Sequence, residues 1–282
     1  MKAALTNIAR LIYRRTPSAR IKQFYLDMLY TVVRGRKVRA TVDGLTFDLD
    51  LSEVIDTSMY LGRYEPDVTA AFERYCRPGD TVLDIGANVG AHTLRVAKLV
   101  GEKGRVYAFE PMDYAYQKLL RNLALNSFAT IKTFRIALSD QDLPQQQINF
   151  RSSWLTNRAR MDSPSVVDFV KLDNWCGAND IDRIDLIKID VDGNEYGVLA
   201  GGYKTIEACR PTFIMEAAGL HFENPDRNPL ALLKNLGYRF WNTISGEEYV
   251  ELYDLQKVFP PNDHEMSVSV NLIAATAEPP SG

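Results

Sequence analysis

The stretch that decides the fold is TVLDIGANVGAHTLRVAKLV, residues 81–100. It begins as a short apolar run, passes through an acid, two glycines and an asparagine, and ends with the spacing of an amphipathic helix. A strand, a glycine turn and a helix in this order are typical of a doubly wound α/β sheet. Ligands bind such sheets at the carboxyl ends of the strands. The stretch therefore predicts a ligand site beside its turn.

The alternation of strand and helix patterns continues along the chain. Apolar strand patterns lie at 105–111, 130–140, 184–193, 211–218, 239–244 and 267–276, and helical patterns lie at 112–126, 194–209 and 228–238. Strands that alternate with helices of this length predict a mostly parallel sheet with helices on both faces. We predict a doubly wound, Rossmann-like α/β domain with seven strands and an antiparallel edge formed by the last two.

Three regions are expected to organise the chain. Residues 1–44 form a helical N-terminal extension, divided by Pro17 and closed by a hairpin around Asp43 and Gly44. Residues 45–276 form the ligand-binding domain, and 277–282 form a frayed tail. The polar segment 141–169 interrupts the alternation and reads either as a lid or small hairpin on the substrate side, or as an insertion without a role.

The composition is that of a water-soluble globular protein, with 46% hydrophobic and 24% charged residues. Three distant cysteines favour reduced thiols in the cytoplasm over disulfides or a zinc site. Residues 1–17 are expected to form a helix and not a signal peptide, because Arg10 interrupts their apolar run. No apolar run reaches the length of about 18 residues that a membrane span needs.

The first 40 residues are strongly basic, with ten lysines and arginines against one acid, Asp27. Such a segment on an acidic body favours an anionic partner, here a membrane surface or a lipid-linked glycan. Peripheral binding at the inner membrane face is therefore one expectation. Dimerisation through the same helices and an idle solvated helix face are the alternatives, and nucleic acid is not favoured.

The turn after the first strand favours a particular cofactor. Its spacing is Asp84-x-Gly86-x-Asn88-x-Gly90, so asparagine stands where a dinucleotide fingerprint has the glycine that admits a pyrophosphate. The two glycines leave the backbone open to a ligand. An acid at position 84 repels a diphosphate but can accept a hydrogen bond from an ammonium group. S-adenosylmethionine carries an ammonium and a carboxylate but no phosphate, and is the expected cofactor.

Further cofactor contacts are expected at the ends of the next two strands. Glu110, followed by Pro111, can accept hydrogen bonds from both ribose hydroxyls. Thr93 lies at the cofactor end of the helix that follows the glycine turn. The residues expected to border the adenine are Ala137, Leu138 and Ser139.

These motifs resemble one known family. The segments DIGANVGAHTL, YAFEP, ALSD and above all IDLIKIDVDGNEYGVLAGG are similar to those of FkbM-type S-adenosylmethionine-dependent methyltransferases. The resemblance covers about residues 45–275 and leaves the basic N-terminus outside. It implies a class I methyltransferase fold and O-methylation of a hydroxyl on a saccharide or a secondary metabolite.

Methyl transfer requires a nucleophile held in line with the methyl group, and a base improves a poor nucleophile. Asp190, at the end of strand pattern 184–193, is the first candidate for the base or for orienting the acceptor. Glu195 suits either the site or the first turn of a helix, and Lys188 is expected to pair with a nearby acid. His264 and His221 are further candidates for the base.

Glu216, at the end of strand pattern 211–218, completes the catalytic candidates. With Asp190 it offers two oxygen ligands for Mg²⁺, but Gly193 stands where catechol-type enzymes place a lysine, so a metal is not favoured. His92 is expected to pack or to contact the cofactor. A nicotinamide-dependent oxidoreductase and a non-catalytic scaffold with the same fold are the alternative functions.

Overall fold

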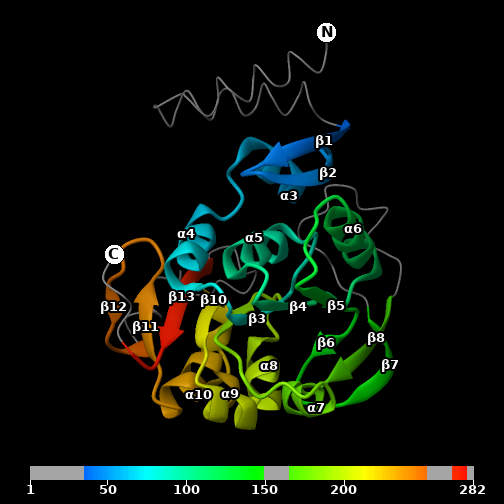
Figure 1. Cartoon of the computed structure of the whole chain (residues 1–282). Helices are drawn as coiled ribbons and strands as arrows, with labels where there is room; N and C mark the ends of the chain where they lie inside the picture. Colours follow the sequence, from blue (N-terminus) through cyan, green and yellow to red (C-terminus); the bar gives the residue numbers. More distant parts are fainter. Residues whose placement is uncertain (1–34, 149–164, 253–268, 278–282) are drawn as a thin grey trace. The chain divides into compact units, whose positions relative to one another are not determined.

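The structure is a computed structural model that describes residues 35–148, 165–252 and 269–277 (Figure 1). The predicted helices over 2–33, most of the predicted tail and His264 lie outside these residues. The contacts within the chain divide the described residues into two units. One comprises 35–66 and 124–126, and the other comprises the remaining described residues. The predicted boundary between residues 44 and 45 stays a prediction.

The first unit contains a β-hairpin and a short helix. Strands β1 (Lys37–Val42) and β2 (Leu45–Asp50) pair antiparallel around Asp43 and Gly44, which have φ angles of 53° and 82°. Two consecutive positive φ angles are those of the turns that fit the twist of a hairpin. The predicted hairpin is therefore confirmed. Helix α3 (Val54–Leu61), which the sequence pattern did not predict, follows and ends at Gly62 in the left-handed conformation.

The second unit alternates strands and helices. Its strands are β3 (Thr81–Ile85), β4 (Arg105–Phe109), β5 (Ile131–Phe134), β6 (Ala137–Leu138), β7 (Leu143–Ile148), β8 (Ser165–Val170), β9 (Leu186–Ile189), β10 (Thr212–Ala218), β11 (Arg239–Asn242), β12 (Glu248–Tyr249) and β13 (Ser269–Ala275). Its helices are α4 (Pro66–Tyr75), α5 (Ala91–Val100), α6 (Asp113–Ala124), α7 (Leu172–Ala178), α8 (Glu195–Gly201), α9 (Tyr203–Cys209) and α10 (Pro229–Asn235), with 3-10 turns η2 (Gly219–Phe222) and η3 (Pro225–Arg227).

The main sheet has the order β12-β11-β13-β10-β9-β3-β4-β5. Strands β10, β9, β3, β4 and β5 pair in parallel, whereas β13 runs antiparallel to both β10 and β11. This confirms the doubly wound fold and its antiparallel edge. The strand number differs from the seven predicted, because Glu248–Tyr249 adds a two-residue edge strand to β11.

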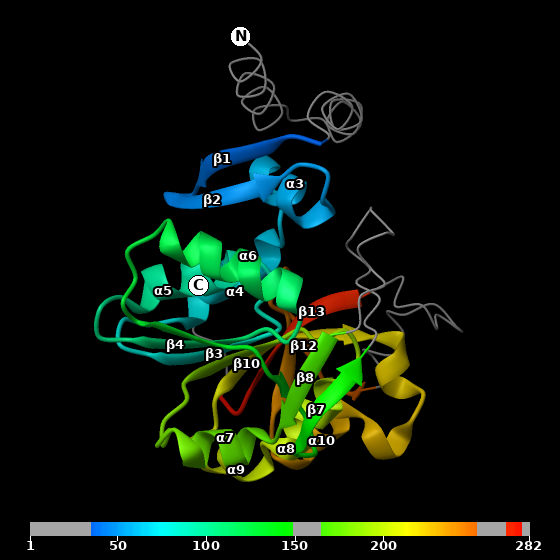
Figure 2. The ribbon, with the colours of Figure 1, turned by 90° about the vertical axis from the view of Figure 1, so that its right-hand side faces the viewer.

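The central parallel strands β3 and β9 are buried at every position, which explains their mostly apolar sequences. Leu83 and Ile85 of β3 face one core with Val198 and Leu230 from the helices, while Val82 faces a second core with α4 and α5. Figures 1 and 2 show α4, α5 and α6 on one side of the sheet and α7 to α10 on the other. The two layers hold the strand ends in place from both sides.

Two predicted elements are wrong in their extent. The strand predicted over 130–140 divides after Phe134, and Ala137–Leu138 instead pairs with β8 in a separate sheet of order β6-β8-β7. The helix predicted over 194–209 divides at Gly202 into α8 and α9. There a Cβ atom would lie 2.6 Å from Leu172 Cδ2, so a larger residue at this position would require the Leu172 side chain of α7 to shift.

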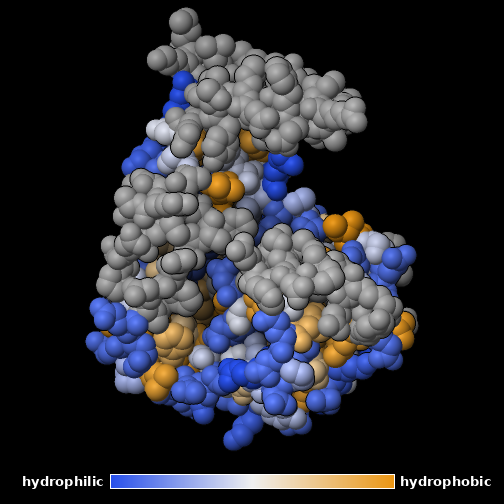
Figure 3. Space-filling view, turned by 180° about the vertical axis from the view of Figure 1, so that it is seen from behind, coloured by the Kyte–Doolittle hydropathy of each residue, from blue (hydrophilic) through white to orange (hydrophobic). Residues whose placement is uncertain are grey.

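The polar segment 141–169 contains part of a hairpin. Leu143–Ile148 and Ser165–Val170 pair antiparallel, and the residues between them lie outside the described ranges. None of the helices in the described part of the chain has the length and apolar character needed to cross a membrane. In its lower part, the face seen in Figure 3 is mostly hydrophilic, with hydrophobic residues scattered across it.

Candidate active site

The candidate site lies at the point where the strand order reverses. From β3 the chain continues outward through β4 and β5 on one side, and through β9 and β10 on the other. Doubly wound sheets bind ligands at such a switch point, beyond the carboxyl ends of the strands. The parallel register pairs Ile85 with Ile189, so the glycine turn after β3 and Asp190 after β9 emerge side by side.

The glycine turn is shaped by the protein around it. Gly86 has a φ angle of 82°, and a Cβ atom there would lie 1.8 Å from the carbonyl oxygen of Asp190. At Gly90, with φ of 85°, a Cβ atom would lie 2.5 Å from Leu119 Cδ1. The prediction that a ligand lies against the backbone of these glycines stays a prediction. At both positions the cleared space is filled by neighbouring residues of the chain.

Glu110 ties the glycine turn to the end of β4. Its Oε2 accepts a hydrogen bond from the backbone N–H of Asn88 at 2.9 Å, and its Oε1 accepts one from Met112 N–H at 2.9 Å. Asn88 itself is in the left-handed conformation, with φ of 48°. Burial raises the pKa of Glu110 to about 7, although the two backbone hydrogen bonds oppose the rise. Glu110 as a whole is 6% exposed and is followed by half-buried Pro111.

Asp84 forms a hydrogen bond inside the protein core. It is completely buried, and its Oδ2 accepts a hydrogen bond from the hydroxyl of Thr93 at 2.6 Å. Thr93 is also completely buried. Each is enclosed by the other and by the surrounding core, and direct cofactor contacts from these two residues stay a prediction. Their bond fastens the first turn of α5 to β3.

The ammonium group beside Asp84 belongs to the protein. Lys188 on β9 is 3% exposed, and its Nζ lies 3.9 Å from Asp84 Oδ1 and 3.2 Å from Asp190 Oδ2. It also donates a hydrogen bond to the Gly86 carbonyl at 3.4 Å. The predicted pairing of Lys188 with a neighbouring acid is confirmed. The lysine links the acid of the glycine turn to the acid at the end of β9.

The residues predicted to border an adenine are all buried. Ala137, Leu138 and Ser139 are 8%, 3% and 7% exposed. The Leu138 carbonyl accepts a hydrogen bond from the side chain of Asn194 at 3.1 Å. A Cβ atom on Gly201 would lie 1.9 Å from the carbonyl oxygen of Ser139. This strand end therefore packs against α8, and the adenine contacts of these three residues stay a prediction.

Several acids gather at the carboxyl ends of β9 and β10. The Asp190 side chain is 29% exposed, and half-buried Glu216 lies close enough to feel its charge. Burial, then the charge of Asp190, raises the pKa of Glu216 to about 7. Asp192 keeps an exposed edge, yet partial burial and the charges of Asp190 and Glu195 raise its pKa to about 6. This edge is thus crowded with negative charge.

No metal centre is evident in the part of the chain that the structure describes, where no three His, Cys, Asp or Glu side chains have the geometry to hold an ion. His92 is buried and packs against Phe72, with ring centroids 5.5 Å apart. His221 is also buried, 4% exposed, and its Nε2 lies 2.7 Å from Glu195 Oε2. His221 was predicted only as a candidate base, and its pairing with Glu195 was not predicted.

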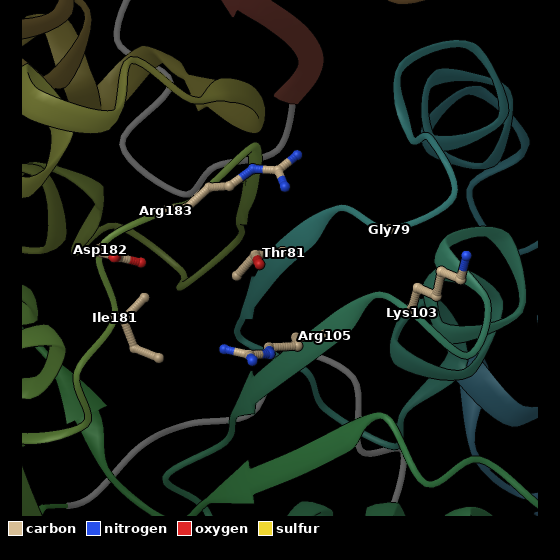
Figure 4. Close-up of a pocket in the computed structure, with 7 residues that line it drawn as sticks. All are labelled: Gly79, Thr81, Lys103, Arg105, Ile181, Asp182 and Arg183. Atoms are coloured by element: carbon tan, nitrogen blue, oxygen red, sulfur yellow. The ribbon is translucent and has the colours of Figure 1, made fainter.

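A polar pocket of about 240 Å³ lies at the opposite edge of the sheet (Figure 4). Thr81 and Arg105 begin β3 and β4, and Ile181, Asp182 and Arg183 precede β9. Its volume is below the range of about 300–1,000 Å³ that is usual for ligand sites. Arg183 is also paired with Asp185 at 2.9 Å. We therefore place the candidate site at the switch point and not in this pocket.

The strand order and the glycine turn at the switch point define the class I methyltransferase fold predicted from the sequence. The model of the methyltransferase FkbM domain matches residues 84–240, which is more than half of the 282 residues. The chain therefore belongs to the FkbM methyltransferase family. This confirms the family that the sequence motifs predicted.

Two curated relatives are similar to part of the chain. The 2-O-methyltransferase NoeI of Sinorhizobium fredii is 29% identical over 156 residues, which cover 48% of this chain and 62% of the relative. The hexuronic acid methyltransferase AglP of Haloferax volcanii is 24% identical over 162 residues, which cover 56% and 64%. The chain thus spans less than two thirds of either relative. A crystal structure of a methyltransferase FkbM from Methylobacillus flagellatus aligns at 15% identity with a TM-score of 0.43, covering 78% of this chain and 54% of that one.

Proposed function

We propose that the protein transfers a methyl group from S-adenosylmethionine to a hydroxyl oxygen of a saccharide. Membership of the FkbM methyltransferase family supports the reaction class. The relatives' names, a 2-O-methyltransferase and a hexuronic acid methyltransferase, support an oxygen acceptor on a sugar. The observation that carries the proposal is the contact between Gly86 and Asp190, because it brings the glycine turn and a partly exposed acid to the same switch point.

The residues at this edge suit the cofactor. Glu110 stands at the end of β4 with a carboxylate whose remaining lone pairs can accept hydrogen bonds from ribose hydroxyls. Half-buried Gly86 and Asn88 present backbone at the start of α5. The hydrogen bond between Asp84 and Thr93 supports this turn by joining β3 to α5. Residues 137–139 pack against α8 beside it. In this proposal the buried members of the predicted set act on the cofactor through their neighbours.

Asp190 is proposed to act on the acceptor. S-adenosylmethionine supplies an electrophilic methyl group on a sulfonium, and the acceptor oxygen forms the new C–O bond as the C–S bond breaks. Asp190 accepts the hydroxyl proton, while Lys188 at 3.2 Å favours the ionised form of the carboxylate. General-base catalysis of this kind contributes roughly 10²–10⁴-fold. Glu216 is proposed to hold a second hydroxyl of the sugar, and a role for His264 stays a prediction.

The proposal is tested with tritium-labelled S-adenosylmethionine and two acceptors, a neutral methyl hexoside and a methyl hexuronide. We expect label to move to at least one acceptor, with a mass gain of one methyl group that is stable to base, as an ether is and an ester is not. Calorimetric binding of NADH in place of S-adenosylmethionine would instead support the oxidoreductase alternative. Neither the family match nor the two relatives supports that alternative. Binding of neither would favour the scaffold.

A further inference from the structure

We infer that His221 is a positioning residue, which acts through Glu195 to hold the turn that carries Asp190 and Asp192. This inference rests on the proposed function, because it assigns His221 and Glu195 to support the acid that receives the acceptor proton. The turn connects β9 to α8, and His221 lies in η2, directly after β10. The pair therefore joins the carboxyl ends of two adjacent strands.

Glu195 is the centre of the hydrogen-bond network. Its Oε1 accepts from the backbone N–H groups of Val191 and Gly193, each at 3.2 Å, and so closes the turn around one carboxylate oxygen. Its Oε2 contacts His221 Nε2 at 2.7 Å. Both side chains are buried, at 0% and 4% exposed. No part of Glu195 is open to a substrate, so its contribution is to the shape of the turn.

The second ring nitrogen of His221 settles the direction of these bonds. Nδ1 lies 3.2 Å from the backbone nitrogen of Ala218, whose N–H can only donate. Nδ1 is therefore the acceptor. In the neutral ring Nε2 carries the proton and donates a hydrogen bond to Glu195. Burial raises the pKa of Glu195, but the hydrogen bonds that its carboxylate accepts from His221 and from backbone N–H groups outweigh the effect of burial and lower the pKa. The carboxylate is thus held ionised.

The turn between β9 and α8 contains a strained residue that these hydrogen bonds stabilise. Asp192 has a φ angle of 50° and Gly193 one of 104°, and a positive φ is costly for a residue with a Cβ atom. The left-handed conformation of Asp192 persists only when its surroundings fix it. With both ring nitrogens committed and 4% of its surface exposed, His221 is not placed to take the acceptor proton itself.

Two substitutions separate the bonds of His221. His221→Asn keeps an acceptor near the position of Nδ1 for the Ala218 N–H but cannot reach Glu195, whereas His221→Gln carries a donor near the position of Nε2. Asn228→Ala is the matched control, because Asn228 is 8% exposed and its side chain caps α10 by accepting from the N–H groups of Leu230 and Ala231, and not from those of the turn. Each variant is compared with the full-length wild type.

Hydrogen exchange is measured at the Val191 and Gly193 amides, and methyl transfer to the acceptor that the wild type uses best. We expect His221→Asn to exchange both amides at least tenfold faster and to lower kcat at least tenfold, with little change in the KM for S-adenosylmethionine. His221→Gln should restore most of both losses, and Asn228→Ala should change neither. Wild-type protection and kcat in His221→Asn would overturn the inference. An inactive wild type that still binds S-adenosylmethionine would count against the proposed function, and the exchange data would still decide whether His221 holds the turn.

Discussion

The ammonium nitrogen of Lys188 lies 3.2 Å from Oδ2 of Asp190, two residues further along the same strand end. Alternate residues of a strand share a face, which is why this pair can form. The same nitrogen lies 3.9 Å from Asp84, so one buried cation stands between the acid beneath the glycine turn and the acid proposed for chemistry. The positions of both acids therefore depend on this lysine.

Replacing Lys188 by methionine should strongly destabilise the fold. The substitution keeps the length of the side chain but leaves Asp84 buried without its cation, and breaking a buried pair in this way costs about 3–5 kcal/mol. Urea unfolding measures the loss. Lys132→Met is the control, since Lys132 is an exposed lysine on β5 of the same sheet and should change stability by less than about 0.5 kcal/mol. Equal stabilities in the two variants would contradict this account of Lys188.

Gly86→Ala and Gly79→Ala form a matched pair. Both glycines have positive φ angles, 82° and 93°, but a Cβ atom at Gly86 meets the Asp190 carbonyl at 1.8 Å whereas one at Gly79 meets nothing within 4 Å. The strain of a left-handed residue, about 1–2 kcal/mol, is common to both. We expect Gly86→Ala to cost about 1–3 kcal/mol more, by overpacking. Gly86→Ala should also weaken S-adenosylmethionine binding. Similar unfolding free energies for Gly86→Ala and Gly79→Ala would contradict this account, because they would show that the turn adjusts to the added methyl group at little cost.

The affinity for S-adenosylmethionine should rise with pH. Because burial raises the pKa of Glu110 to about 7, its carboxyl group is protonated at lower pH and must lose this proton to accept two ribose hydroxyls. Calorimetry should find an increase of up to about tenfold per pH unit below pH 7 and a plateau above it. The slope should vanish in Glu110→Gln. It should persist in Glu216→Gln, although the pKa of Glu216 is also raised to about 7.

Without ligand, Glu110 has the opposite effect on stability. Its pKa in the folded protein lies above the ordinary value of 4.5, so between these two values the folded protein holds more protons than the unfolded chain. Its contribution to the free energy of unfolding therefore falls as pH rises from 4.5 to about 7. Thermal unfolding of Glu110→Gln should show a shallower decline across this window than the wild type does. A parallel decline would indicate that other groups cause it.

Much of the fold was predictable because local patterns and tertiary packing agree. Strands such as Leu186–Ile189 are buried on both faces, and their unbroken apolar runs are visible in the sequence. The glycine turn and the acids at strand ends were predicted because they lie at the ends of such apolar runs. The divided strand at Phe134 was missed, because residues 130–140 read as one strand pattern and only pairing with β8 shows where the chain changes sheets.

The inner part of the site could not be predicted from local sequence. Asp84 reads as a ligand contact because it ends a strand beside a glycine turn, but Thr93 and Lys188 enclose it from other elements. The Glu195 and His221 pair joins residues on different elements, and no spacing rule connects them. Burial distinguishes such supporting residues from exposed ones, and burial is decided by the whole fold.

The most direct test of the proposed site compares Asp190→Asn with Asp182→Asn. Asp190 lies at the switch point and its side chain is 29% exposed, whereas Asp182 is exposed at the opposite edge of the sheet. S-adenosylmethionine binding is measured by calorimetry and methyl transfer by label incorporation, on both variants. We predict that Asp190→Asn binds the cofactor within about threefold of wild type and loses roughly 10²–10⁴-fold in kcat, with Asp182→Asn unchanged. Wild-type turnover in Asp190→Asn would contradict the assignment of Asp190 to the chemistry.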